Sequence, residues 1–237
     1  MPRPIPALAA FVTTVVLLAG CSGDSGGIDV PAHSVVDAHE ILITGADIER
    51  ELDGAQALDG TEPFASTVDD YLAARASDIP PIDPEPCGDA VVDLVLLDRD
   101  AGAAGTVYTA PRIRLQNGYE LVQTGREFAG ADAAETWLAA YRAVLEGCPE
   151  FTVHLEDSDV RVAQTVTDAG SGRDGFVVRL EITGEAGTPT YNEQWVLRDG
   201  PFVVLASSAT GDGDDAALLP AVDAIHARLV AAIDAAT

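Results

Sequence analysis

The fold is decided by the stretch QWVLRDGPFVVLAS, residues 194–207, which lies near the end of the chain. Two mainly apolar runs, 194–198 and 202–207, flank the dipeptide Asp199-Gly200. An Asp-Gly pair between two such runs is typical of a hairpin, because both residues tolerate the positive φ angles of a tight turn. Strands joined by so short a connection pair antiparallel. The stretch therefore predicts an antiparallel sheet.

The chain upstream continues this pattern. Further strands are predicted at 112–116, 119–124, 151–155, 160–167 and 176–183. Asn117-Gly118 lies between the first two of these and predicts a second hairpin. We find no strand–helix–strand alternation of the kind that builds a parallel sheet, so all of these strands are expected in one antiparallel sheet.

Helices are expected before and after these strands. Apolar residues recur at helical spacing from Trp137 to Leu145, with a stop at Gly147, and again over about 216–235. The dense apolar run 90–97 favours a helix, with a buried strand as the alternative. Capping-box patterns at Thr44/Asp47 and Ser66/Asp69 predict two shorter helices. The fold class expected is α+β, with the antiparallel β-sheet flanked by helices.

The first twenty residues have the pattern of a signal peptide. Arg3 and the amino terminus precede an apolar run, Ala7 to Ala19, which is shorter than the roughly 20 residues that a transmembrane helix needs. Leu18-Ala19-Gly20-Cys21 then matches the lipobox of bacterial lipoproteins, in which the cysteine thiol accepts diacylglycerol. We expect cleavage before Cys21 and lipidation of Cys21.

The sequence after Cys21 divides into a tether and a domain. Residues 21–38 begin with a Gly/Ser-rich stretch that cannot form a core, and they are expected to form a flexible tether. Residues 39–237 are expected to form one α+β domain. The lipid would hold this domain at the cell membrane, on the extracytoplasmic face.

The charge of the chain excludes nucleic acid as a partner. Its 13 basic residues are all Arg, its Asp and Glu total 39, and its formal net charge is −26. Such a surface repels phosphate backbones and anionic lipid head groups alike. Contact with the membrane is therefore expected only through the covalent anchor.

Two cysteines remain once Cys21 carries lipid. Cys87 and Cys148 belong to an exported chain and lack C-x-x-C spacing, so they are expected to pair in a structural disulfide. Closing a loop of about 60 residues stabilises a fold by roughly 4 kcal/mol in the chain-entropy picture.

Candidate ligand-binding residues are few. Arg112 and Arg114 are alternate residues of a predicted strand, so they face one side, where they either hold an anion or pair with nearby carboxylates. Trp195 either lines a cleft or belongs to the core. No catalytic residue, metal site or cofactor is predicted.

Four motifs that suggest chemistry fit structural roles better. Gly23–Gly27 spells the surroundings of a serine-protease nucleophile but lies in the tether, and the glycine-rich Gly170–Gly175 is followed by a strand where a dinucleotide site needs a helix. Asp212, Asp214 and Asp215 precede a predicted helix, whose N-terminus their charge suits. The four histidines, His33, His39, His154 and His226, show no ligand spacing.

Five features follow one another along the chain: Ile41-Leu42-Ile43-Thr44, Asp83-Pro84-Glu85-Pro86-Cys87, the helix ending Tyr141–Cys148, the hairpin from Gln194, and the closing helix. Their order resembles the PknH-like extracellular sensor domain family of actinobacteria. The resemblance implies an antiparallel sheet flanked by helices, a cleft for an unidentified ligand, and no enzymatic activity. Kinase members of the family tend to carry two disulfides, whereas this chain has cysteines for one.

The function expected from the sequence is a lipid-anchored, extracytoplasmic, sensor-like module that binds a small ligand or an envelope protein. The alternative is a carrier or chaperone of envelope lipids, or a partner protein in envelope assembly. An envelope hydrolase is disfavoured, because neither a nucleophile–base pair nor a metal-ligand set is visible.

Overall fold

The computed structural model describes residues 41–43, 47, 52, 54–58, 64–67, 79–100, 103–110, 112–115, 118–170, 172–210 and 218–236. Cys21, the predicted signal peptide and the predicted tether lie outside these residues. Most of the helix predicted around Thr44 also lies outside them, although Asp47 is helical.

The described residues form one eleven-stranded antiparallel sheet, as predicted. Nine strands follow the order β1-β5-β6-β11-β10-β9-β8-β7-β3, while β4 pairs with β6 and β2 pairs with β4. The strands are β1 (Gln56–Ala57), β2 (Phe64–Thr67), β3 (Ile82–Asp83), β4 (Ala103–Thr109), β5 (Ile113–Arg114), β6 (Glu120–Phe128), β7 (Glu150–His154), β8 (Asp159–Asp168), β9 (Asp174–Thr183), β10 (Pro189–Asp199) and β11 (Phe202–Thr210).

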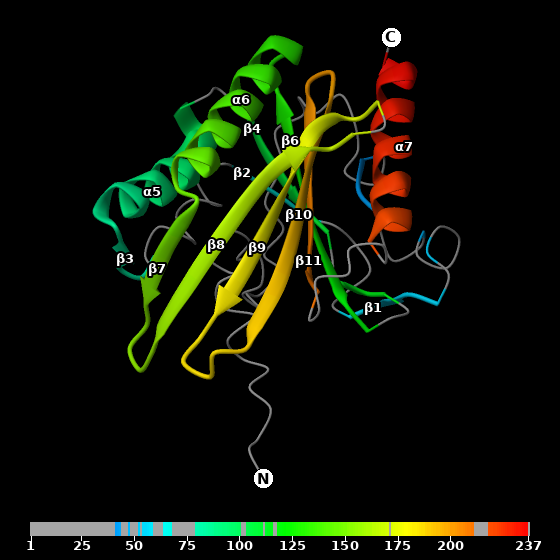
Figure 1. Cartoon of the computed structure of the whole chain (residues 1–237). Helices are drawn as coiled ribbons and strands as arrows, with labels where there is room; N and C mark the ends of the chain where they lie inside the picture. The colour runs from blue at the N-terminus through cyan, green and yellow to red at the C-terminus, as the bar shows by residue number, and fades with distance from the viewer. Residues whose placement is uncertain are drawn as a thin grey trace.

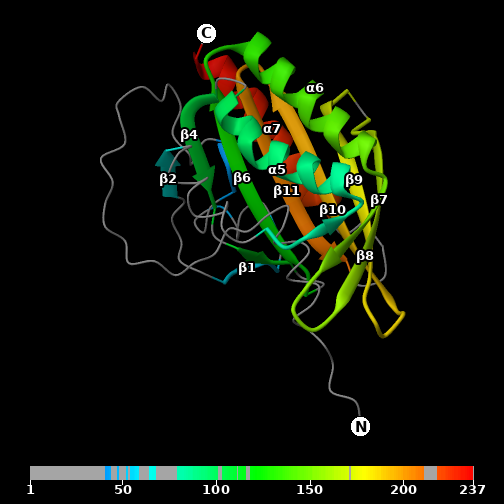
Figure 2. The ribbon, with the colours of Figure 1, turned by 90° about the vertical axis from the view of Figure 1, so that its left-hand side faces the viewer.

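Helices cover both faces of this sheet. They are α5 (Glu85–Asp100), α6 (Ala131–Gly147) and α7 (Leu219–Ala236). Figure 1 shows α6 and α7 on opposite sides of the sheet, and Figure 2 shows α5 and α6 in front of it with α7 behind. The fold class predicted from the sequence, α+β with helices flanking the sheet, is confirmed.

The hairpin that decided the fold forms, but its turn lies one residue later than predicted, because Asp199 pairs with Phe202 and leaves Gly200 and Pro201 as the turn. Gln194 lies opposite Ser207 and Trp195 opposite Ala206, and Gly200 in the turn has φ of 51°. Because strand side chains alternate, Trp195 packs in the core beneath α7 and Val196 packs in the core beneath α5 and α6. One strand pair thus supplies both cores.

Gly175, at the start of β9, allows the next strand to approach closely. Its φ is 147°, and a Cβ built there would lie 2.0 Å from the carbonyl oxygen of Val196. Only glycine fits this position without a backbone shift.

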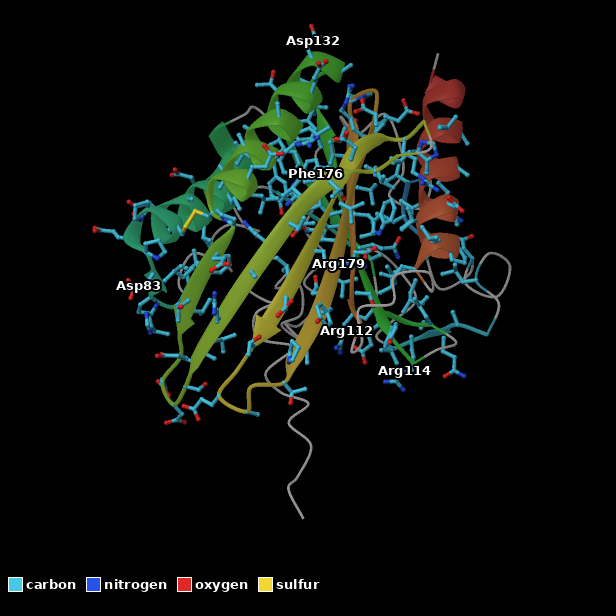
Figure 3. The ribbon with its side chains drawn as sticks, viewed as in Figure 1. Asp83, Arg112, Arg114, Asp132, Phe176 and Arg179 are labelled. Carbon is cyan, nitrogen blue, oxygen red and sulfur yellow. A yellow bond between two sulfur atoms is a disulfide. The ribbon has the colours of Figure 1, made fainter. Side chains whose placement is uncertain are left out.

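The predicted disulfide joins α5 to the end of α6. Cys87 bonds Cys148 across a sequence separation of 61 residues, with Cα atoms 5.5 Å apart (Figure 3). The run 90–97 is helical, as favoured, and the strand alternative was wrong. The bridge ties the first turn of α5 to the residue that follows α6.

Two local predictions need correction. The helix predicted from Ser66 does not start there, because Ser66 lies in β2 and pairs with Val107 of β4. The remaining residues of that predicted helix, from 68 on, lie outside the described residues. Strand β5 is also shorter than predicted, so that Arg112 precedes it.

None of the helices in the described part of the chain combines the length and apolar character that a membrane crossing requires.

Candidate functional site

Arg112 and Arg114 pair with a carboxylate, which is one of the two roles considered for them. Each guanidinium lies 3.3 Å from a different oxygen of Glu120, and all three side chains are 40–50% exposed. Figure 3 labels both arginines near the lower end of the sheet. The ion pair is open to solvent, where such contacts contribute little to stability.

Trp195 is a core residue. It is 7% exposed, its Nε1–H donates to the carboxylate of Glu193, and the guanidinium of Arg173 lies 5.5 Å from its ring centroid. Arg173 pairs in turn with Asp223 of α7, and Arg179 pairs with Glu193 at 3.5 Å. Trp195 and the two predicted arginines therefore belong to separate sets of contacts.

An aromatic stack lies on the other face, beneath α6. Phe128 is 5.7 Å from Trp137, Trp137 is 4.8 Å from Tyr141 with nearly parallel rings, and Tyr141 is 6.0 Å from Phe176, between ring centroids. Trp137 and Tyr141 meet because residues four apart share a helix face. The stack joins β6, α6 and β9.

Polar groups adjoin this stack, and we call them the α6 polar layer: Arg126, Trp137, Tyr141, Gln194 and Ser207. The hydroxyl of Tyr141 donates to Oε1 of Gln194 at 3.3 Å, and Ser207 lies directly across from Gln194 on β11. All five side chains are at most 5% exposed. The layer is therefore a polar cluster in an otherwise apolar core.

Three polar atoms of the layer are left without a hydrogen bond among the described residues. Within the part of the chain that the structure describes, Trp137 Nε1, Gln194 Nε2 and Ser207 Oγ are buried and have no hydrogen-bond partner. A buried polar group left in this state costs about 1–3 kcal/mol. Buried groups of native proteins are normally paired, so three such atoms in one cluster are unusual.

Arg126 gives the layer a positive charge. Its guanidinium carbon lies 5.0 Å from the centroid of the Trp137 ring, and its Nη1 donates to the hydroxyl of Thr124 at 3.3 Å. A cation over an indole face is attracted to it, the more so when both are desolvated. The unpaired atoms of the indole and of the amide are both N–H donors.

This layer was not predicted from the sequence. Trp137 and Tyr141 were predicted as helix and core residues, with a cleft-lining role left open for one of the aromatic residues Trp137, Tyr141 and Trp195. Gln194 and Ser207 interrupt apolar runs, and they share a face because they pair directly across the hairpin. The pairing with α6 depends on a long-range contact that no local pattern shows.

His154 has a structural role. Its two ring nitrogens each lie 2.8 Å from a carboxylate oxygen, one of Asp159 on β8 and one of Asp83 on β3. The hydrogen bond with Asp159, followed by the one with Asp83, raises the pKa of His154 above its ordinary value. In the described part of the chain, no group of three His, Cys, Asp or Glu residues is placed to hold a metal ion.

The comparisons with known proteins concern the fold. No family model matches the sequence, and no curated protein matches it. Among solved structures, the extracellular domain of PknH from Mycobacterium tuberculosis is similar, with a TM-score of 0.54 and 15% identity, over 85% of this chain and 98% of that domain. A putative uncharacterized protein from Mycobacterium smegmatis gives a TM-score of 0.42 and 10% identity, over 86% and 99% of the two chains. The chain thus has a fold like that of the PknH extracellular domain.

Proposed function

We propose that this chain is a lipid-anchored, extracytoplasmic, sensor-like module of the PknH-like kind, which binds a ligand in the α6 polar layer and catalyses no reaction. The similarity to the PknH extracellular domain supports the sensor-like assignment through the fold. The lipobox ending at Cys21 and the Cys87–Cys148 bridge support an exported, anchored protein.

One observation carries the ligand-binding part of this proposal. The α6 polar layer leaves buried donors of Trp137 and Gln194 without a partner among the described residues, inside the core beneath α6. A polar cluster that is only partly satisfied is less stable than an apolar core in the same place. Such a cluster is expected where a ligand completes the hydrogen bonds.

Native mass spectrometry of the full-length protein tests this proposal. The lipoprotein is extracted from its own host in a mild detergent, and its native mass is compared with its mass after denaturation. We expect an added mass, beyond the covalent lipid, that disappears on denaturation and is absent from the Gln194→Met variant.

Gln123→Met is the matched control for that experiment. Gln123 is a buried glutamine on the opposite face of the sheet, so its variant is expected to keep the added mass. No added mass on the wild-type protein, or equal retention by Gln194→Met, would contradict the proposal. An added mass of a long-chain lipid would favour the lipid-carrier alternative.

The anchor is tested separately at Cys21. Metabolic labelling with an alkyne fatty acid is expected to label the wild-type protein and the neighbouring Ser22→Ala variant, and to leave Cys21→Ala unlabelled. The reason is that only the Cys21 thiol accepts the diacylglycerol, whereas Ser22 belongs to the tether. Label on Cys21→Ala would remove the lipobox assignment.

A further inference from the structure

A histidine lies between two carboxylates at the outer edge of the sheet. His154, the last residue of β7, has its Nε2 2.8 Å from Oδ2 of Asp83 on β3 and its Nδ1 2.8 Å from Oδ1 of Asp159 on β8. Figure 3 labels Asp83 beside the start of α5. The contact with Asp159 joins two strands of one hairpin, whereas the contact with Asp83 spans 71 residues of sequence. Only the second contact attaches a distant part of the chain.

The two contacts together require a protonated imidazole. An ionised carboxylate only accepts hydrogen bonds, and a neutral imidazole has a single N–H. Neutral His154 therefore donates to one of the two aspartates, while its other ring nitrogen turns a lone pair toward the second carboxylate. The imidazolium form donates to both. The same hydrogen bonds, first that with Asp159 and then that with Asp83, raise the pKa of His154.

The other charged groups around His154 are arginine and carboxylates. Arg161 lies two residues beyond Asp159 on the same face of β8, and its hydrogen bond with Glu150 raises its pKa, so it keeps its charge. The remaining charged side chains of the adjoining segments are Glu85 at the start of α5, Glu156 and Asp157 in the turn between β7 and β8, and Glu181 on β9. Among these types of side chain, the imidazole is the one that ordinarily changes charge between about pH 5 and 8.

Strand β3 is attached to the sheet by few contacts. It has two residues, and among the described strands it pairs with β7 alone. The backbone N–H of His154 donates to the carbonyl of Pro81 at 2.9 Å, and Ile82 packs in the core beneath α5 and α6. The disulfide at Cys87 holds the first turn of α5 at any pH. A loss of the contact with Asp83 therefore acts on β3 and leaves α5 in place.

We infer that His154 is a pH-operated latch, which holds β3 against the edge of β7 while both ring nitrogens carry a proton and loosens it when one proton is lost. This inference depends neither on the ligand nor on the lipid anchor of the proposed function. The side chain of His154 is 36% exposed, so the proton passes directly to water. The latch is closed below pH 6.5 and opens as the pH rises through the raised pKa of His154. Its opening uncovers the backbone edge of β7, and an unpaired strand edge is a surface on which another strand can pair.

Two adjacent amides of β7 report separately on the latch. Thr152 lies opposite Asp83 and, by the alternation of an antiparallel ladder, its N–H donates to β3. Val153 lies opposite Val160, and its N–H donates to β8 on the other side. Amide hydrogen exchange of the full-length ¹⁵N-labelled protein in detergent micelles, corrected for the intrinsic exchange rate at each pH, measures the protection of both amides.

We expect the protection of Thr152 to fall as the pH rises through the titration of His154, while Val153 keeps its protection. The fall is at most about tenfold per pH unit, because a single proton is involved. In His154→Gln the profile of Thr152 is expected to be flat, since a carboxamide does not titrate. In Asp83→Asn the introduced carboxamide can donate to the neutral ring nitrogen, so Thr152 is expected to stay protected at high pH.

Three results overturn the inference. The first is a protection of Thr152 that does not change with pH in the wild-type protein. The second is the same fall in Asp83→Asn as in wild type, which would show that another group titrates. The third is a parallel fall at Thr152 and Val153, which would mean that the whole edge of the sheet opens rather than β3 alone.

Discussion

Gln123 and Gln194 are both buried glutamines, and they lie on opposite faces of the same sheet. Gln123 uses both atoms of its amide: Oε1 accepts from the backbone N–H of Ile43 at 3.1 Å, and Nε2 donates to the carbonyl of Ile43 at 3.3 Å. Gln194 uses its Oε1 with Tyr141, while its Nε2 has no partner within the described residues.

The difference extends to the residues around each glutamine. On the α7 face, Trp195 donates to Glu193, Arg173 pairs with Asp223, and Arg228 pairs with Asp47 at 2.8 Å. On the α6 face, the indole of Trp137 has no acceptor among the described residues. Ser208 is the exception beneath α7, since its buried hydroxyl has no partner in the described part of the chain. The comparison shows that the polar groups named beneath α7 pair mostly with one another, whereas buried atoms of the α6 polar layer are left without a partner among the described residues.

The disulfide should produce the largest effect on this comparison, because it holds only the α6 side. Replacing Cys87 and Cys148 together by alanine is expected to lower the free energy of unfolding by about 4 kcal/mol, since the unfolded chain regains the entropy of a 61-residue loop. Denaturant unfolding at equilibrium measures this change.

Amide hydrogen exchange locates the loss. Protection is expected to fall first in α5 and α6, while the strands beneath α7 keep theirs until global unfolding. Uniform loss of protection across both faces would show that the bridge does not act on the α6 side selectively.

The fold could be predicted from the sequence to the extent that local patterns specify it. The signal at Asp199-Gly200 identified the hairpin of β10 and β11, although the turn lies at Gly200 and Pro201, and the spacing from Trp137 to Leu145 identified α6. The helix start predicted at Ser66 was wrong, because Ser66 pairs with β4, which is far along the chain. The signals that succeeded were those in which the deciding contacts are close in sequence.

Replacing each of the two glutamines in turn provides the second test of the contrast between the two faces. Gln123→Met removes both partners of Ile43 and leaves its buried N–H and carbonyl unsatisfied, so we expect a loss of about 3 kcal/mol in stability. Gln194→Met removes a group that is only half satisfied and replaces it with an apolar side chain of similar shape. We expect this change to alter stability by less than about 1 kcal/mol.

Chemical denaturation of the ligand-free variants measures both changes under one condition. Equal losses would show that Gln194 contributes to the core as Gln123 does, which would remove the basis for the α6 polar layer. A clear loss for Gln123 alone would support the contrast between the faces.

The candidate site could be predicted only in part. Arg112 and Arg114 were recognised as sharing a face, which they do, and their pairing with a carboxylate was one of two expectations. Trp195 was considered for a cleft and belongs to the core. The α6 polar layer joins β6, α6, β10 and β11, and a contact among four elements leaves no periodic signal in any one of them.

The smallest expected effect is that of pH at the edge of the sheet. His154 is hydrogen-bonded by Asp159 and Asp83, which raises its pKa above 6.5, the value for the unfolded chain. Its contribution to stability is therefore fully present below pH 6.5 and is lost as the pH rises through the raised value. We expect wild type to be more stable than His154→Gln at low pH, and this difference to disappear at higher pH.

Unfolding curves of wild type and His154→Gln, recorded from below pH 6.5 to above the raised pKa of His154, check the prediction. In the Asp159→Asn background, the stability difference that His154→Gln produces is expected to be smaller. The neighbouring ion pair of Arg161 and Glu150, 2.8 Å apart, is present in both proteins, and the hydrogen bond with Glu150 raises the pKa of Arg161, so Arg161 keeps its charge across the window. A difference that grows as the pH rises would reverse the assigned sign and would mean that His154 is held in its neutral form. Because β3 directly precedes α5, the contact of His154 with Asp83 lies on the side of the molecule that the disulfide also holds.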